Sequence, residues 1–382
     1  MSQSINSEVE ILFHQGLQHH QAGEYEKAIA CFDQVLEIQP NSSAAWNERG
    51  WNLFLLDNES ATAAALASFD KVIEIEPDNF SAWHRRGQVY LERLSDHAES
   101  LVNFQQALKI KPDDYDVLWD RSFALYQLGH YDEALASYNK TLELDPNSCA
   151  VWQERSGMLF EMGCYDESLA SYEKLLEINP DDYLGWRERG KVLESLNRYP
   201  EAITSYEQAL KIKPDAWEIW SYKGEIFEKI GDVTEALASH KNALKCNEKS
   251  EIAWYEWARI LIDFGQIEEA IAACDQAISV LDDKFTAWQN RSIVLHELGR
   301  YEEAIASYHQ ALEFNPNDAD TFYNIACCYA LQGHVEQAIQ SLQQAINLGD
   351  DTFIAAAEND ADFDTIRQAN EFQTFMQQAV SH

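Results

Sequence analysis

Apolar residues recur along most of this chain at the spacing of amphipathic helices. Within residues 183–216, Trp186 and Leu193 share one helical face, and Ala202 and Tyr206 share one face of a second stretch. Intervals of four and seven residues return to the same side of an α-helix. The pattern predicts two helices in this segment, and the same two-helix pattern returns before and after it.

The connection between the two predicted helices carries a residue that accepts left-handed backbone. In successive segments this residue is Gly129, Gly163, Asn197, Gly231, Gly265, Gly299 and Gly333. Such a residue commonly ends a helix. Prolines recur at the far end of the second helix, at Pro112, Pro146, Pro180 and Pro214. Because proline interrupts a helix interior, each segment is predicted to be a helical hairpin.

The hairpins repeat with a period of 34 residues. Fixed places of the period hold Trp186 (place four), Gly190 (place eight), Ala202 (place twenty) and Pro214 (place thirty-two). A 34-residue period with these residues resembles the tetratricopeptide repeat (TPR). The resemblance implies an all-α fold, a TPR α-solenoid in which hairpins stack as a right-handed superhelix. The recurring W-x-x-R-G form resembles bacterial arrays of this repeat.

The repeat covers residues 1–352 and predicts ten units, at about 9–42, 43–79, 80–114, 115–148, 149–182, 183–216, 217–250, 251–284, 285–318 and 319–352. Units two and three are too long, with the excess near Asp57–Thr62 and Ser95–Glu99. This excess predicts either longer surface turns or a projecting contact loop. Units seven and eight depart from the pattern, because His240 and Cys274 replace the aromatic residue of place twenty-four.

The two ends of the array differ from its middle. Unit one has Leu12 in place of tryptophan, and its edge, with Ile11 and His19, is a candidate surface for weak self-association. Residues 353–382 carry an apolar stripe made of Phe363, Ile366, Phe372, Phe375 and Met376. The stripe predicts a C-terminal capping helix over the last unit. A helix that binds a partner is the alternative.

Three recurring residue types predict how the hairpins pack. Small residues at place eight are expected to face place twenty, as Gly50 faces Ala65. The aromatic residue of place four is expected to be buried against the next hairpin, at Trp46, Trp83, Trp152, Trp186, Trp220, Trp254 and Trp288. Place seven is basic, at Arg49, Arg86, Arg121, Arg155, Arg189, Lys223 and Arg291. A packed stem with a carboxylate partner is favoured there over a basic ladder for an acidic ligand.

The chain is strongly acidic, with 65 Asp and Glu against 28 Lys and Arg and a formal net charge of −37. This balance argues against nucleic acid and anionic membrane surfaces as partners. It favours a soluble surface, and it suits a partner of basic character. The seven cysteines include no C-x-x-C pair, and the start of the chain resembles no signal peptide, so a cytoplasmic protein is predicted. No apolar run is long enough for membrane insertion.

The sequence contains no motif of a known catalytic or cofactor site. There is no P-loop, G-x-G-x-x-G, H-E-x-x-H or G-x-S-x-G. His14, His19 and His20 lack the spacing of a helical metal site, and Cys327 and Cys328 are adjacent and therefore point to different helix faces. The sequence therefore predicts no catalytic residue, no cofactor and no metal.

The resemblance implies that the first helix of each unit lines a concave groove that holds partner peptides. Places 2, 5, 6, 9, 12 and 13 would face it. Exposed aromatic residues there would anchor a partner, with partial burial against the neighbouring helix as the alternative. The candidate groove residues are Trp51, Arg85, Trp119, Phe123, Tyr126, Glu154, Arg187, Lys191, Tyr222, Glu225, Tyr255 and Arg259. Further aromatic residues at these places are Phe13, Phe54, Phe160 and Tyr323.

The predicted function is a non-catalytic scaffold that binds a protein or peptide in this groove during assembly of a complex. A partner of basic character would suit the acidic groove. Two alternatives stay open. The chain would be the non-catalytic subunit of an enzyme, because the α subunit of protein prenyltransferases is also an array of helical hairpins. Otherwise it would be a structural protein that assembles end to end through unit one.

Overall fold

The computed structural model describes residues 2–56, 58–249, 251–349 and 352–380. All regular elements in these ranges are helices, and the predicted all-α class is confirmed. Asp57 of the predicted long turn, residues 350–351 at the end of unit ten and residues 381–382 of the predicted cap lie outside the described residues. No helix in the described ranges combines the length and the apolar character needed to cross a membrane.

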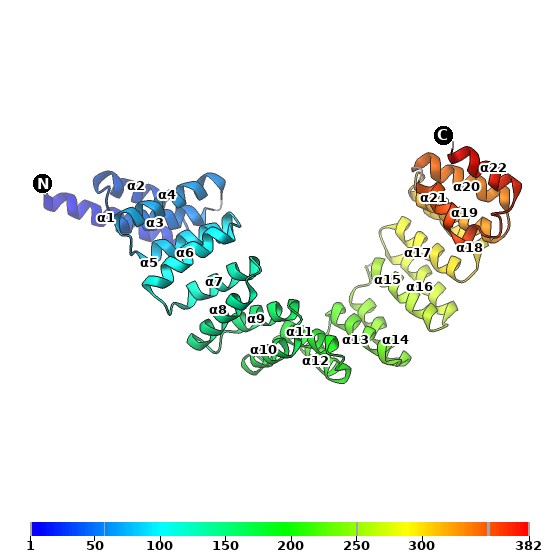
Figure 1. Cartoon of the computed structure of the whole chain (residues 1–382), viewed down its shortest axis with the longest axis horizontal. Coiled ribbons are helices and arrows are strands. Elements are labelled where there is room, and N and C mark those ends of the chain that lie inside the picture. The colour runs from blue at the N-terminus through cyan, green and yellow to red at the C-terminus, as the bar shows by residue number, and fades with distance from the viewer. Residues whose placement is uncertain (1, 57, 250, 350–351, 381–382) are drawn as a thin grey trace. The chain divides into compact units, whose positions relative to one another are not determined.

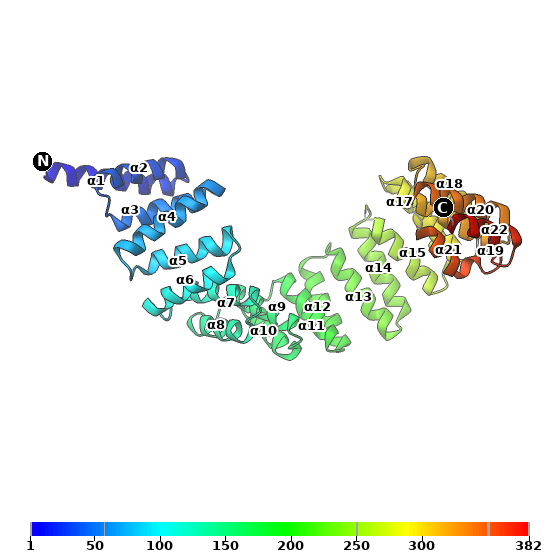
Figure 2. The same cartoon turned by 45° about the horizontal axis from the view of Figure 1, so that its top comes forward.

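The chain divides into two compact units, Met1–Leu196 and Asn197–His382. The first contains α1 (Ser2–Gln21), α2 (Tyr25–Ile38), α3 (Ser43–Leu55), α4 (Glu59–Ile75), α5 (Phe80–Gln88), the π-helical turn η1 (Val89–Arg93), α6 (His97–Ile110), α7 (Tyr115–Gln127), α8 (Tyr131–Leu144), α9 (Cys149–Glu161), α10 (Tyr165–Ile178) and α11 (Tyr183–Ser195). Consecutive helices of this unit lie side by side (Figures 1 and 2).

The second unit contains α12 (Tyr199–Ile212), α13 (Trp217–Ile230), α14 (Val233–Cys246), α15 (Glu251–Asp263), α16 (Ile267–Val280), α17 (Lys284–Glu297), α18 (Tyr301–Phe314), α19 (Ala319–Leu331), α20 (Val335–Leu348), α21 (Thr352–Asn359), the 3-10 turn η2 (Ala361–Phe363) and α22 (Asn370–Val380). Its helices also pack in chain order. Each unit is therefore built from neighbouring helices, as expected of a repeat array.

The predicted turn residues adopt left-handed backbone. Gly129 has φ 75° and Asn197 has φ 57°. After α7 the backbone N–H of Gly129 donates to the Tyr126 carbonyl over 2.9 Å, and the N–H of His130 donates to the Leu125 carbonyl over 2.9 Å. These bonds satisfy the last carbonyls of the helix and turn the chain toward α8.

The excess residues of units two and three do not form longer turns, and that prediction is wrong. In unit two they lengthen the second helix, because α4 has 17 residues where α6 has 14. Asn58 caps its start by accepting from the Ala61 N–H over 2.9 Å. In unit three the first helix ends in the π-helical turn η1, which accommodates an extra residue, and Ser95 follows with φ 52°.

Small residues at place eight make room for the aromatic ring of place twenty-four. A Cβ added to Gly50 would lie 2.8 Å from the ring of Phe69, and one added to Gly87 would lie 2.5 Å from Phe104. Both rings are fully buried. The glycine therefore leaves room for a ring of the sister helix, and the expected contact of Gly50 with Ala65 stays a prediction.

The tryptophans of place four are half-buried rather than buried, except Trp254, which is 5% exposed. Their indole N–H groups make one recurring hydrogen bond, to the carbonyl six residues earlier. Trp46 donates to Pro40 over 2.8 Å, and the same bond joins Trp83 to Pro77, Trp152 to Pro146, Trp186 to Pro180, Trp220 to Pro214 and Trp254 to Glu248. The tryptophan thus fixes the link between two hairpins.

The basic residues of place seven are structural, as favoured from the sequence. Arg49 pairs with Asp33 of the preceding helix over 2.6 Å, donates to Ser68 of the sister helix over 2.7 Å and lies 5.5 Å from the ring of Trp46. The same carboxylate partnership joins Arg86 to Asp70, Arg189 to Glu173, Lys223 to Glu207 and Arg291 to Asp275. One side chain therefore ties together three helices.

The apolar stripe of the tail packs on the last helical pair. Phe363, Ile366, Phe372 and Met376 are buried against Ala330 and Leu342, among other residues of α19 and α20. The tail is two α-helices joined by η2 rather than a single helix, because Asp360 accepts from the Asp362 N–H and starts a new turn there. At the other end Ile11 is 55% exposed, whereas Leu12 packs against a core that includes Val35.

Candidate partner-binding site

Several predicted groove residues of the first unit are engaged with one another or with neighbouring acids. The Trp119 indole donates to Glu154 over 2.7 Å, and the Tyr138 hydroxyl donates to the same carboxylate over 3.2 Å. Burial raises the pKa of Glu154 above its ordinary value, although both hydrogen bonds favour the ionised form. Trp119 and Glu154 therefore form an internal contact between α7 and α9, which matches the alternative of partial burial.

Other predicted residues of this unit are also paired. Arg85 lies 4.8 Å from the ring of Trp51 and 3.1 Å from Glu48. Arg187 and Lys191 both reach Glu188 on their own helix. These contacts leave little unbalanced positive charge for an acidic ligand.

The remaining aromatic residues of the first unit differ in exposure. Phe123 is 36% exposed, and its ring lies 6.5 Å from that of His97. The Tyr126 hydroxyl donates to Glu161, which raises the pKa of Tyr126 to about 12. Phe54 is only 5% exposed and belongs to the core, so it is not a groove residue. Tyr323 of the second unit likewise packs under the tail, where its hydroxyl donates to Asp360 over 2.9 Å.

The structure brings three predicted residues together in one pocket of the second unit. Tyr222, Glu225 and Arg259 line a cavity of about 350 Å³ formed by α13, α14 and α15. These three helices follow one another in Figure 1. The other lining residues are Trp217, Glu218, Ser221, Glu228, His240, Ala243, Leu244, Ala253, Glu256, Trp257 and Ile260. Tyr255 is not among them.

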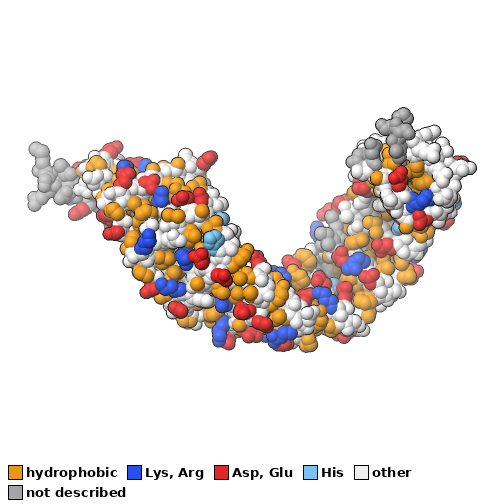
Figure 3. Space-filling view, in the orientation of Figure 1, with side chains coloured by type: hydrophobic (Ala, Val, Ile, Leu, Met, Phe, Trp, Pro, Cys, Tyr) orange, Lys and Arg blue, Asp and Glu red, His pale blue; other side chains and the backbone are white. Residues whose placement is uncertain are grey.

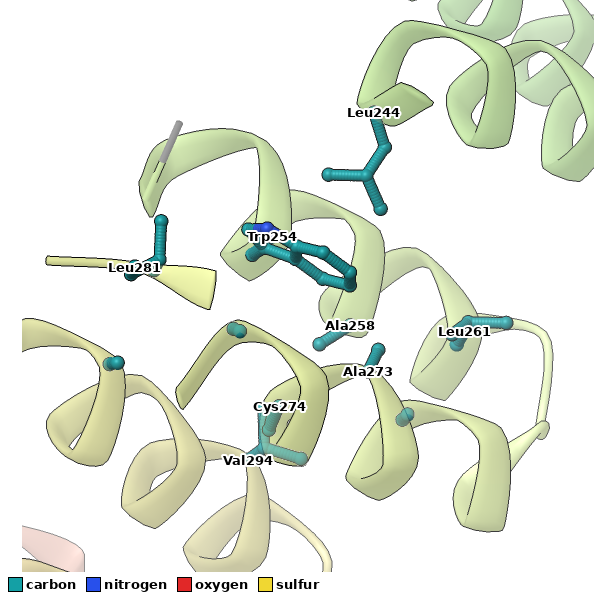
Figure 4. Packing of buried hydrophobic residues seen from close by; sticks show 11 residues of the cluster. Leu244, Trp254, Ala258, Leu261, Ala273, Cys274, Leu281 and Val294 are labelled. Atoms are coloured by element: carbon teal, nitrogen blue, oxygen red, sulfur yellow. The ribbon is translucent and has the colours of Figure 1, made fainter. Parts of the chain in front are cut away.

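The pocket has an apolar wall. Leu244 and Ile260 are buried, while Trp217 is 37% exposed. Leu244 also belongs to the core cluster around Trp254, so this wall continues into the packed interior (Figure 4). A wall that is part of the core is held in place by the fold, and it can receive an apolar stem without rearranging.

The charges around the cavity are predominantly negative. Glu218, Glu225, Glu228 and Glu256 line it, and Arg259 is the one Lys or Arg among the lining residues. Arg259 is itself paired, with Glu256 over 2.8 Å and Asp263 over 2.9 Å, and the hydrogen bond to Glu256 raises its pKa. An acidic cavity with a low-dielectric wall concentrates a negative potential.

His240, a residue of α14, lines one side of the pocket. Its Nε2 lies 2.5 Å from Glu228, and a Cβ added to Gly224 would lie 2.5 Å from the imidazole ring. Burial lowers the pKa of His240, and the nearby Glu228 carboxylate opposes this effect. The ring therefore takes the position that a tyrosine or phenylalanine holds in other repeats. Its Nε2 atom faces the Glu228 carboxylate.

Sequence reasoning missed His240, Trp217 and Trp257 as lining residues. The available signal was the departure of units seven and eight from the repeat. His240 replaces the aromatic residue of place twenty-four, and Trp257 stands at place seven, where most other units have arginine or lysine. The pocket thus lies where the sequence departs from the repeat.

Family models of the tetratricopeptide repeat match residues 9–42, 80–114, 115–148, 150–182, 252–280 and 319–348, and a further TPR repeat model matches residues 190–231 and 293–333. The chain belongs to the tetratricopeptide repeat family. A model of the protein prenyltransferase alpha subunit repeat matches residues 62–92. None of the curated proteins compared with the chain matches it.

Solved structures with a similar fold come from the same family. The C-terminal part of a TPR repeat-containing protein from Cytophaga hutchinsonii is 17% identical, with 63% of this chain and 97% of that chain covered and a TM-score of 0.57. A tetratricopeptide repeat protein from Parabacteroides merdae is 18% identical, with 67% and 99% covered and a TM-score of 0.47. YrrB, described as a TPR protein with an unusual peptide-binding site, is 23% identical, with 49% and 97% covered and a TM-score of 0.36. The likeness to the first of these, whose TM-score exceeds 0.5, establishes the fold alone.

Proposed function

We propose that this protein is a non-catalytic scaffold that binds a partner protein or peptide, and that the α13–α15 pocket receives a lysine or arginine side chain of that partner. The observation that supports the proposal is the cavity of about 350 Å³, in which four glutamates surround an apolar wall. A lysine or arginine has an apolar stem and a cationic head, so its two parts match the two parts of the cavity.

Charge and aromatic groups together favour this occupant. Trp217 and Trp257 can stack against a guanidinium group or pack along an alkyl stem. Glu218 and Glu225 supply the opposite charge, and the net charge of −37 attracts a basic segment over a longer distance. The groove residues of the first unit, such as Trp51, Phe123 and Tyr126, remain candidates for contact with a partner.

The proposal is tested with the full chain and peptides that have constant apolar flanks and a central Lys, Arg, Leu or Glu. We expect the Lys and Arg peptides to bind at least about tenfold more tightly than the Glu peptide, a difference of about 1.4 kcal/mol. Glu218→Gln combined with Glu225→Gln should remove that preference. Raising the salt concentration should weaken wild-type binding, since the attraction is screened.

The matched control is Glu269→Gln combined with Glu336→Gln, because both residues are exposed glutamates on helices outside the pocket. This variant has the same net charge as the pocket variant. It should keep the preference for Lys and Arg. Equal affinity of the wild type for Lys and Glu peptides, or equal loss in both variants, would exclude the pocket as the cation site.

A second candidate function is the non-catalytic subunit of a prenyltransferase-like enzyme, which the match of residues 62–92 favours. This match begins within the lengthened helix α4 and ends in η1. The test is purification from the native cell, followed by mass spectrometry. A zinc-containing catalytic partner would support this candidate, whereas unrelated partners with exposed basic segments would support the scaffold.

Three expectations stay predictions: the division into ten repeats, the cytoplasmic and bacterial setting, and self-association through repeat unit one. Light scattering over a series of protein concentrations distinguishes a monomeric scaffold from end-to-end assembly. The exposed Ile11 makes the variant Ile11→Glu a direct probe of that edge. A constant molecular mass for the wild type would remove self-assembly from consideration.

A further inference from the structure

Four side chains with metal-binding atoms converge where the tail packs on the last repeats. His296 comes from α17, Cys327 from α19, and Asp360 and Asp362 from the segment between α21 and η2 and from η2 itself. The ligand atoms of Cys327, Asp360 and Asp362 all lie within 4.8 Å of one another. The Nε2 atom of His296 lies 3.3 Å from the Oδ2 atom of Asp362.

One of these metal-binding atoms is buried without a hydrogen-bond partner. The Nε2 atom of His296 is buried and makes no hydrogen bond of acceptable geometry, although the side chain as a whole is 25% exposed. Buried polar atoms normally have a partner. The His296 Nε2 atom faces the Asp362 carboxylate without a hydrogen bond, and a metal ion bound to both groups would give this nitrogen a partner.

Two of the six ligand-to-ligand distances match those around a tetrahedral ion. With Zn–S of about 2.3 Å and Zn–N or Zn–O of about 2.0 Å, neighbouring ligand atoms in a tetrahedron are about 3.3–3.5 Å apart. The Cys327 Sγ atom lies 3.7 Å from the Asp360 Oδ2 atom, and the His296–Asp362 separation is 3.3 Å. Two edges of the group thus have nearly the lengths that a zinc ion requires.

We propose that His296, Cys327, Asp360 and Asp362 form a Zn²⁺ site that ties the tail to the last repeats. One sulfur, one nitrogen and two oxygen donors suit Zn²⁺, whereas Ca²⁺ and Mg²⁺ take more oxygen ligands and no thiolate. All four tetrahedral positions are filled by the protein, so the site is structural and leaves no position for a substrate.

The surroundings hold the ligands in place. The Tyr323 hydroxyl donates to the Oδ2 atom of Asp360 over 2.9 Å, and the Asp362 N–H donates to its Oδ1 atom over 3.0 Å. Phe363, next to Asp362, is fully buried among residues of α19 and α20. Hydrogen bonds to a ligating carboxylate orient it toward the ion. No metal site is evident from the sequence, because these donors lie in separate segments and form no local motif.

The test is titration of the tag-free, chelator-treated chain with Zn²⁺ in a calorimeter and with Co²⁺ in a spectrophotometer. We expect one Zn²⁺ per chain, an increase of the melting temperature, and Co²⁺ bands that show tetrahedral coordination and a bond to thiolate. Binding of a metal to the folded chain alone raises its stability. Cys327→Ser should abolish the thiolate band, and Asp362→Asn should weaken Zn²⁺ binding at least about tenfold.

Two controls keep the outcome decisive. Cys246→Ser and His309→Gln change an exposed thiol and an exposed imidazole of the same unit, and both should bind like the wild type. Asp362→Asn keeps the shape of a partly exposed side chain, so it serves if Cys327→Ser, which alters a buried residue, fails to fold. Absence of stoichiometric Zn²⁺ binding, or equal binding by the wild type and Asp362→Asn, would overturn the proposal.

Discussion

At the scale of single residues, the repeat is held together by a small set of polar contacts that recur with it. The indole N–H of a tryptophan donates a hydrogen bond to a carbonyl just before its helix. The arginine three places later forms an ion pair with the preceding helix and a hydrogen bond with the sister helix. The arginine was identified as structural from the sequence, because its stem could pack and acids were abundant. Its serine partner was not anticipated, since a lone serine on a second helix carries no signal by itself.

Replacing the place-seven arginine should destabilise the protein. Arg49→Ala loses a half-exposed ion pair, a hydrogen bond to Ser68 and packing on Trp46. We expect a loss of about 1–2 kcal/mol in unfolding free energy, measured by urea denaturation. Lys71→Ala, which removes an exposed ion pair with Glu74, should change it by less than about 0.5 kcal/mol. Equal effects of the two substitutions would show that the arginine has no structural role.

His240 should make the protein sensitive to mild acid. Because burial lowers its folded pKa below the unfolded value of about 6.5, the unfolded state binds a proton first as the pH falls. Stability is therefore full above pH ~6.5 and decreases as the pH falls through the folded pKa. His240→Phe, which restores the aromatic residue of other repeats, should reduce the loss of melting temperature between pH 7.5 and 5.5. An unchanged pH dependence would contradict this account.

At the scale of elements, the small residues set how closely the two helices of a hairpin approach each other. The sequence predicted a close crossing at Gly50 but assigned it to Ala65, because both residues are small. In the structure the nearest atoms to a Cβ at Gly50 belong to Phe69, so the glycine accommodates the largest side chain of the sister helix. Periodicity identifies which residues face inward, but it does not decide which inward residues touch.

Adding a methyl group at this crossing should be costly. Gly50→Ala would bring a Cβ to 2.8 Å from the Phe69 ring, so we expect a loss of about 1–3 kcal/mol in unfolding free energy. Gly157→Ala is the matched control, because Gly157 lies in α9 and nothing lies within 4 Å of its added Cβ. That substitution should be neutral or stabilise by up to about 1 kcal/mol. Similar losses at both positions would refute the close crossing.

The sequence predicted the helices, their turns and the apolar face of the tail, because these follow from local periodicity and from glycine and proline chemistry. It did not predict where the three extra residues of α4 would go, since a longer turn and a longer helix have the same local pattern. For the pocket it identified Tyr222, Glu225 and Arg259 but not His240 or Trp257, which contribute through contacts between separate helices.

At the scale of the whole molecule, charge is the dominant property. Acidic side chains are interspersed with hydrophobic ones on the visible face (Figure 3). A net charge of −37 on 382 residues produces repulsion that opposes folding. It also favours association with basic partners, whose binding relieves that repulsion.

Salt should therefore stabilise the free protein while weakening its complex. We expect the melting temperature to rise between about 20 and 500 mM NaCl, as screening reduces repulsion among the acids. Over the same range the affinity for a lysine-centred peptide should fall. A melting temperature that falls with salt would show that attractive ion pairs, rather than net repulsion, dominate the surface.

If a partner binds at the α13–α15 pocket, it should protect the helices that form the pocket. This is measured by hydrogen–deuterium exchange of the full chain with and without a saturating lysine-centred peptide. We expect slower amide exchange in α13 and α15, and no such slowing in the variant with Glu218→Gln and Glu225→Gln. Protection confined to other helices, with exchange in α13 and α15 unchanged, would contradict it.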